Sequence, residues 1–236
     1  IYEEYVEKEN EVLTAIVQRV EKGNVYVELG KTDGILTPNE MIPGETYENN
    51  DRLKVYVLEV RKDNKGPQVL VSRTHPGLVK RLFELEVPEI QTGVVQIKSI
   101  AREAGFRTKV AVHSSDMQVD AVGACVGQRG ARVERIVNEL HNEKIDIIEW
   151  DSDSAVYIAK ALSPAKVLMV YINDSEKAAK VIVPDTQLSL AIGKEGQNAR
   201  LAAKLTGWKI DIKSQSQAEE AMGAYYEETE TSESEA

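Results

Sequence analysis

The sequence predicts a multidomain chain in which a small all-β barrel is followed by two copies of an α+β unit. The main observation is a repeat: the quartet Gly127-Gln-Arg-Gly130 returns 66 residues later as Gly193-Lys-Glu-Gly196, and Lys144-Ile-Asp-Ile147 returns 65 residues later as Lys209-Ile-Asp-Ile212. Because loop, helix and strand keep their spacing, the repeat indicates a duplicated structural unit. The second observation is a series of short alternating segments before Ser72, separated by glycine-containing turns.

The region before the repeat reads as five strands in about 60 residues, which favours a closed barrel of the OB type. We assign residues 1–11 to the end of an upstream helix, so that a chain beginning at Ile1 is expected to be a fragment or a processed product, and residues 12–75 to the barrel. The expected strands are Val12–Val20, Val25–Leu29, Ile35–Leu36, Leu53–Val60 and Gln68–Ser72.

The two α+β units are assigned to residues 76–150 and 151–214, with no linker between them. The first is expected to have a helix from Pro76 to about Leu85, strands at Gly93–Ala101 and Arg107–His113, the first quartet, a helix at Arg129–Leu140 and a strand at Lys144–Trp150. The second is expected to have a helix at Asp153–Leu162, strands at Val167–Ile172 and Ala179–Val183, the second quartet, a helix at Gln197–Leu205 and a strand at Trp208–Lys213. Residues 215–236 read as an acidic, disordered tail.

Charge and composition limit the possible functions. The formal charge is −10, but residues 1–11 carry −4 and residues 214–236 carry −7, so that the remainder is at +1. Any affinity for phosphate must therefore come from local clusters of basic residues. The single cysteine, Cys125, cannot form an internal disulfide, and there is neither a signal peptide nor a run of 18 apolar residues. We expect a cytoplasmic protein without a membrane segment.

Each quartet follows an apolar helical segment and precedes a second helix. Glycines let another backbone approach closely, and the second helix offers unpaired N–H groups and its positive dipole end to a phosphate. Both copies match the pattern of KH domains, in which a Gly-x-x-Gly loop clamps about four nucleotides of a single strand. The alternative, a plain helix–helix turn, is less favoured because the context occurs twice. The order of elements is that of the bacterial, type II KH topology.

The predicted RNA contacts follow from these loops. In the first loop they are Val126, Gly127, Gln128, Arg129, Gly130 and Arg132, and in the second they are Ile192, Gly193, Lys194, Gly196, Gln197 and Arg200. The alternative for the arginines is a solvated helix face. Arg73, Arg81, Lys98 and Arg102, near the junction of the barrel and the first unit, could extend the RNA track or only pair with nearby glutamates. The histidines have no metal-ligand spacing, so neither a metal nor a cofactor is expected.

Two further resemblances extend this interpretation. The segment Val27-Glu-Leu-Gly30, with Gly34-Ile-Leu36, resembles the S1 RNA-binding domain, in which Tyr26 would occupy a base-stacking position. Three other segments resemble the NusA family of bacterial transcription factors. They are Ser72-Arg-Thr-His-Pro-Gly77, Lys80-Arg-Leu-Phe-Glu-Leu-Glu-Val-Pro-Glu-Ile90 and Gly196-Gln-Asn-Ala-Arg-Leu-Ala-Ala-Lys-Leu-Thr-Gly-Trp208. Glu195 departs from that family, which often has a basic residue there, and this favours weaker phosphate contact by the second loop.

The NusA resemblance implies a non-enzymatic S1-KH-KH fragment that lacks the family's N-terminal polymerase-binding domain. It implies binding to nascent single-stranded RNA, and a role in pausing, termination and antitermination. Its implied partners are RNA polymerase, mainly through the missing domain, and other antitermination factors, with the chain itself a monomer.

Other classes of protein fit the sequence less well. A P-loop ATPase is excluded because Gly193-Lys194 lacks the Walker glycine five residues earlier, and no catalytic triad or carboxylate pair is supported by spacing. An RNA-binding accessory module of an RNA-processing enzyme stays open as an alternative. A protein-interaction scaffold with purely structural quartets stays open as well.

Overall fold

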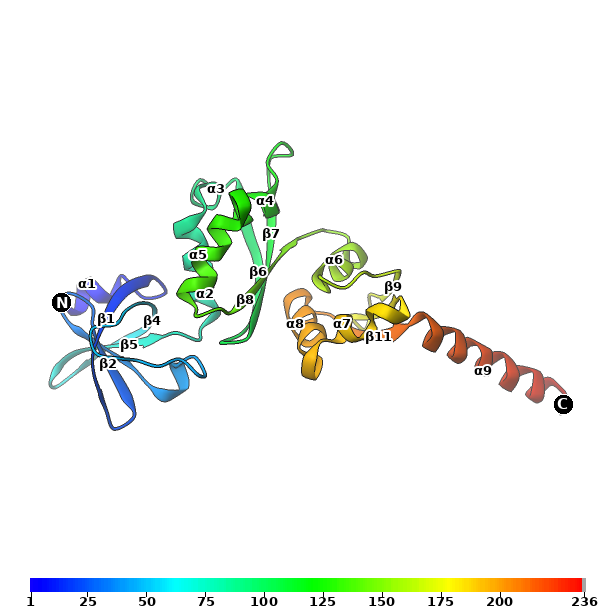
Figure 1. Ribbon diagram of the computed structural model, residues 1–236, viewed down its shortest axis with the longest axis horizontal. Coiled ribbons are helices and arrows are strands. Elements are labelled where there is room, and N and C mark those ends of the chain that lie inside the picture. The colour runs from blue at the N-terminus through cyan, green and yellow to red at the C-terminus, as the bar shows by residue number, and fades with distance from the viewer. Residues whose placement is uncertain (235–236) are drawn as a thin grey trace. The chain divides into compact units, whose positions relative to one another are not determined.

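The computed structural model describes residues 1–234 and contains two compact units, Ile1–Ile147 and a second one that begins at Ile148. The first unit combines the barrel and the first α+β domain, and the second holds the other α+β domain and a C-terminal helix (Figure 1). The predicted fold class is confirmed: a barrel is followed by two α+β domains. None of the helices in this described part of the chain has the length and apolarity needed to span a bilayer.

The barrel is closed by five strands in the order β1-β2-β3-β5-β4. Their bounds are β1 (Val12–Glu21), β2 (Asn24–Glu28), β3 (Asp33–Leu36), β4 (Arg52–Asp63) and β5 (Gly66–Ser72). Side chains alternate across each strand, so Val25 and Val27 of β2 are buried while Tyr26 lies on the outer surface. The short helix α1 (Tyr2–Val6) packs Tyr5 against this core.

The first α+β domain covers one face of a three-stranded sheet, β6-β7-β8, with helices. The strands are β6 (Val95–Glu103), β7 (Arg107–Ser114) and β8 (Lys144–Glu149), and the helices are α2 (Pro76–Glu86), α3 (Pro88–Gln91), α4 (Ala121–Val126) and α5 (Ala131–Glu139). Leu82 and Phe83 of α2 and Ile136 of α5 pack on Val110 and Val112 of β7. This single buried cluster fixes α4 and α5, which flank the first quartet, to the sheet.

The second α+β domain repeats this arrangement. Its sheet has the order β11-β10-β9, with β10 (Ala178–Val183) parallel to β11 (Lys209–Ser214) and antiparallel to β9 (Met169–Asn173). Its helices are α6 (Ser154–Ala161), α7 (Leu188–Ile192) and α8 (Gln197–Thr206). Gly207, in the left-handed conformation, ends α8 as the sequence predicts.

The C-terminal segment differs from the prediction of a disordered tail. Gln215–Ser234 forms a helix, α9, which continues beyond the end of β11 (Figure 1). Ser214 and Gln217 form a capping box: the Gln217 N–H donates to Ser214 Oγ at 3.2 Å, and the Ser214 N–H donates to Gln217 Oε1 at 3.0 Å. The alanines, glutamates and Met222 that follow favour a helix. Residues 235 and 236 of the predicted tail lie outside the described residues.

Candidate nucleic-acid interface

The two glycine quartets have the same backbone conformation. The φ and ψ angles of the first glycine are 78° and 174° in one quartet and 80° and 170° in the other. The third residue has φ and ψ of 55° and 29° in the first quartet and 57° and 24° in the second. The last glycine has 75° and 11° in the first and 75° and 13° in the second. The residues concerned are Gly127, Arg129 and Gly130, and Gly193, Glu195 and Gly196. The repeat in the sequence is therefore a repeat in loop geometry.

The two glycines of each quartet have different roles. A Cβ on Gly127 would lie 2.6 Å from Arg132 Cγ, and a Cβ on Gly193 would lie 2.7 Å from the Asn198 nitrogen. The first glycine thus lets the next helix start in contact with the loop. A Cβ on Gly130 would meet no atom within 4 Å. The last glycine therefore leaves open surface, over which another backbone can pass.

Each quartet leads directly into a helix of nine or ten residues, α5 or α8. The first N–H groups of a helix have no partner within it, and the helix dipole places positive potential there, so the site favours a phosphate. The two middle residues of each loop are exposed: Gln128 and Arg129 in the first, Lys194 and Glu195 in the second. The first loop consequently carries one positive side chain, whereas the second carries one of each sign.

Arg132 and Arg200 brace the quartets from the following helices. Arg132 Nη1 donates to the Ala124 carbonyl at 2.7 Å and lies 2.9 Å from Glu89 Oε2. Arg200 Nη1 donates to the Glu195 carbonyl at 3.0 Å from an exposed position. Both guanidinium groups lie at the loops, and part of the charge of Arg132 is balanced by Glu89.

Asn198 is a structural residue of the second loop that sequence reasoning missed. It stands five residues after the first glycine, where the first unit has Arg132, and it is buried. Its Nδ2 donates to the carbonyls of Ala191 and Leu162, both at 3.0 Å. The amide thereby ties the end of α7 to the loop that follows α6, and the matching position relative to the quartet is the signal that could have identified it.

The remaining predicted loop residues lie beside the quartets. Val126 is half-buried and Ile192 is exposed, each directly before the first glycine of its loop. Gln197 is the first residue of α8 and is half-buried. The structure thus gathers all the predicted loop contacts around the two turns.

The structure contradicts RNA contact by Arg73 and Arg102. The Arg73 side chain is fully buried, with Nη2 at 2.6 Å from Glu45 Oε2 and Nη1 at 3.0 Å from Glu139 Oε1. The Arg102 side chain is also fully buried, and it pairs with the equally buried Glu143 at 3.0 Å. Buried charges need such partners. Arg73 connects the barrel to α5, so its role in this structure is architectural.

Three other candidates lie at the surface of the first unit. Arg81 is half-buried, and it donates to the Asn10 carbonyl at 2.8 Å and to Glu84 Oε2 at 2.7 Å. Lys98 is exposed on β6. Tyr26 is half-buried, with the Arg19 guanidinium carbon 4.3 Å from its ring centroid. One face of the Tyr26 ring is thus already covered by a cation–π contact.

His75 and Cys125, two titratable residues of the first unit, have environments that favour their uncharged forms. His75 Nδ1 accepts a hydrogen bond from the Gly77 N–H at 2.9 Å, its ring stacks on Tyr56, and burial lowers its pKa. Burial also raises the pKa of the Cys125 thiol to about 12, which keeps it protonated. No cluster of three or more His, Cys, Asp or Glu side chains suited to a metal occurs within residues 1–234.

Three family models match successive parts of the chain, between residues 7 and 220. Residues 7–72 match the S1 RNA binding domain, residues 73–150 the NusA-like first KH domain, and residues 154–220 the NusA-like second KH domain.

Similar curated proteins share the printed name "Transcription termination/antitermination protein NusA". The protein from Halalkalibacterium halodurans is 59% identical over 93% of this chain and 58% of its own length. The protein from Bacillus subtilis is 59% identical over 98% of this chain and 62% of its own length. The one from Thermus thermophilus is 50% identical over 89% of this chain. The chain thus spans about three fifths of the first two relatives.

Proposed function

Because this chain belongs to the NusA family of transcription termination/antitermination proteins, we propose that it is the RNA-binding part of a transcription elongation factor. In this proposal the chain contacts nascent single-stranded RNA, and through that contact modulates pausing, termination and antitermination. The observation that carries the proposal is the pair of glycine quartets, which share one backbone conformation and each lead into the N-terminus of a helix.

In the proposed contact, the RNA backbone passes over Gly130, where a Cβ would meet no atom within 4 Å, and over Gly196, where a Cβ would meet only Arg200 Nη1, at 3.9 Å. Helix N–H groups and the dipoles of α5 and α8 hold phosphates, assisted by Arg129 and Arg132 in the first loop and by Lys194, Gln197 and Arg200 in the second. Val126 and Ile192 offer apolar surface beside the first glycines. Tyr26, Arg81 and Lys98 are candidates for weaker, peripheral contacts.

The rest of the proposal concerns the organisation and partners of the chain. It acts without catalysis or a cofactor, as a monomer in the cytoplasm, with domains at residues 12–75, 76–150 and 151–214. RNA polymerase and other antitermination factors are its proposed protein partners. The alternatives are an accessory module of an RNA-processing enzyme and a scaffold whose quartets are structural.

Replacing Gln128 and Arg129 together by Asp tests the proposal. Both side chains are exposed, so folding should be unaffected, while the added negative charge should repel phosphate. We expect single-stranded RNA affinity to fall at least about tenfold, or about 1.4 kcal/mol, in fluorescence anisotropy. The matched control is Asn64→Asp with Lys65→Asp, the same charge change in the exposed turn between β4 and β5. Unchanged affinity in the folded quartet variant would favour the scaffold.

A further inference from the structure

An apolar groove of about 780 Å³ lies in the second unit, between the helix-free face of its sheet and the first turns of α9. Strands β9 and β10 supply Met169, Tyr171 and Ile182, and α9 supplies Ala218 and Met222. Met169, Tyr171 and Met222 are 50–60% exposed. Exposed methionine and aromatic side chains gathered in one patch are typical of protein interaction sites.

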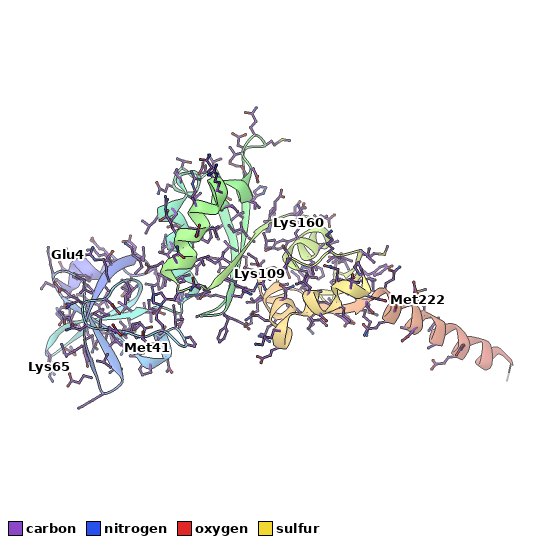
Figure 2. The ribbon with its side chains drawn as sticks, in the orientation of Figure 1. Glu4, Met41, Lys65, Lys109, Lys160 and Met222 are labelled. Carbon is purple, nitrogen blue, oxygen red and sulfur yellow. The ribbon has the colours of Figure 1, made fainter. Side chains whose placement is uncertain are left out.

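The wall formed by α9 is held in place at its base. The Ser216 N–H donates to Asp185 Oδ1 at 3.0 Å, and the Ser216 hydroxyl donates to Asp185 Oδ2. The capping box of Ser214 and Gln217 fixes the first turn as well. Met222, which lines the groove from α9, is labelled in Figure 2. The groove is therefore built before any partner arrives, which lowers the ordering cost of binding.

Comparison of the two repeats shows that this face is specialised. In the first unit, the equivalent sheet face has an ionic cluster in which Arg107 and Lys109 lie 2.7 Å and 2.9 Å from Asp146. In the second unit Lys180 stands at the position of Lys109, two residues after Ala178, which takes the place of Arg107. Asp211, opposite Lys180 in the register of β10 and β11, keeps the position of Asp146, so only one of the three charges is lost. The apolar character of this face comes from β9, where Met169 and Tyr171 stand at the positions of Ser99 and Ala101 in β6.

The shape and charge of the groove indicate its occupant. Lys180 and Lys213 line the strand side, and Glu219 lines the α9 side. The apolar line of α9 continues beyond the groove from Met222 to Tyr225, three residues further along the helix and 66% exposed. We propose that this groove docks an amphipathic α-helix of a partner protein, with apolar side chains on the floor, carboxylates facing Lys180 and Lys213, and a basic flank facing Glu219.

RNA fits this surface less well than a protein helix does. The strand side has one aromatic ring for stacking, Tyr171, and three aliphatic or thioether side chains, Leu168, Met169 and Ile182, and α9 adds Met222. Glu219 in the wall, and Glu220 beside it, would repel phosphates. An apolar stripe laid into a groove between two walls is a recurring mode of helix recognition.

The test is a selection from a displayed library of 18-residue amphipathic helices. The apolar stripe is fixed, and each flank is randomised among Glu, Lys and Ser. The bait is the whole chain, and binders are retested as free peptides against Tyr171→Asp with Met222→Asp. The control, Phe106→Asp, removes an equally exposed apolar side chain from the first unit.

We expect enrichment of helices with one acidic and one basic flank, at least about tenfold weaker binding to the double variant, and unchanged binding to the control. Amide shifts on ¹⁵N-labelled protein should map to β9, β10 and the start of α9, with RNA binding retained. Failure to enrich, enrichment without the charge pattern, or shifts elsewhere would overturn the proposal. So would concentration-dependent self-association through this face, or shifts there on addition of a single-stranded RNA.

Discussion

Arg129 and Glu195 occupy the same position in the two quartets and the same left-handed backbone conformation, yet they carry opposite charges. A carboxylate beside a phosphate site weakens binding. We expect Glu195→Arg to raise affinity for single-stranded RNA about threefold to tenfold, or about 0.7–1.4 kcal/mol. One further cation at a phosphate should also steepen the log–log salt dependence by about 0.7. Anisotropy titrations at several salt concentrations measure both effects.

The matched change is Glu195→Gln, which removes the negative charge without adding a positive one. It should give a smaller gain in affinity and leave the salt slope nearly unchanged. If Glu195→Arg matches wild type in both affinity and slope, the second loop does not touch phosphate.

Replacing either glycine of the first quartet by Ala should have a different effect on stability and on RNA binding. A methyl group on Gly127 collides with Arg132, so Gly127→Ala should lower the thermal midpoint of unfolding markedly. Gly130 has open space around it and a φ of 75°, so Gly130→Ala should cost only about 1 kcal/mol of stability. We expect Gly130→Ala to weaken RNA binding more than its stability loss explains, because the methyl group would lie where the RNA backbone is proposed to pass. Equal effects of both substitutions on affinity, after correction for the folded fraction, would contradict this assignment.

The fold and the two loops could be predicted from the sequence, but which arginine side chains are buried could not. Spacing alone located the quartets because glycine and helix periodicity are local signals. Whether Arg73 or Arg102 faces solvent depends on residues far along the chain, since their partners include Glu139 and Glu143. The segment after Ser214 is helical despite its acidic composition because Ser214 and Gln217 cap its first turn and alanines and glutamates favour a helix.

The buried pair of Arg102 and Glu143 should be essential for folding rather than for binding. Glu143 also accepts hydrogen bonds from Thr108 Oγ1 and the Gly105 N–H, both at 2.7 Å. Glu143→Leu leaves a buried guanidinium without its partner, which we expect to cost about 3–5 kcal/mol of the free energy of unfolding. Glu149→Leu, which removes an exposed partner of Lys160, should cost less than about 1 kcal/mol. Similar losses of the free energy of unfolding for Glu143→Leu and Glu149→Leu, measured by urea unfolding, would contradict the prediction.

The environment of His75 predicts a pH dependence of stability. Burial lowers the pKa of His75, so the folded state favours the neutral ring, whose Nδ1 accepts from the Gly77 N–H. Stability from this group is present above the unfolded pKa of about 6.5 and is lost as the pH falls through the lower folded pKa. Wild type should therefore lose more free energy of unfolding between pH 7.5 and 5.5 than His75→Asn. Parallel pH profiles for the two proteins would show that His75 does not contribute.

The two quartets in one chain predict that affinity depends on RNA length. Only residues 150–153 connect β8 to α6, so an RNA held by one loop raises the effective concentration of that RNA at the other. Each KH loop takes about four nucleotides. We therefore expect affinity to rise up to roughly ten nucleotides and then to flatten, in anisotropy measurements on unstructured RNAs of matched composition. The rise should disappear in the Gln128→Asp, Arg129→Asp variant, because only the weaker second loop then binds. Equal affinity of wild type for five and ten nucleotides would mean that one loop does all the binding.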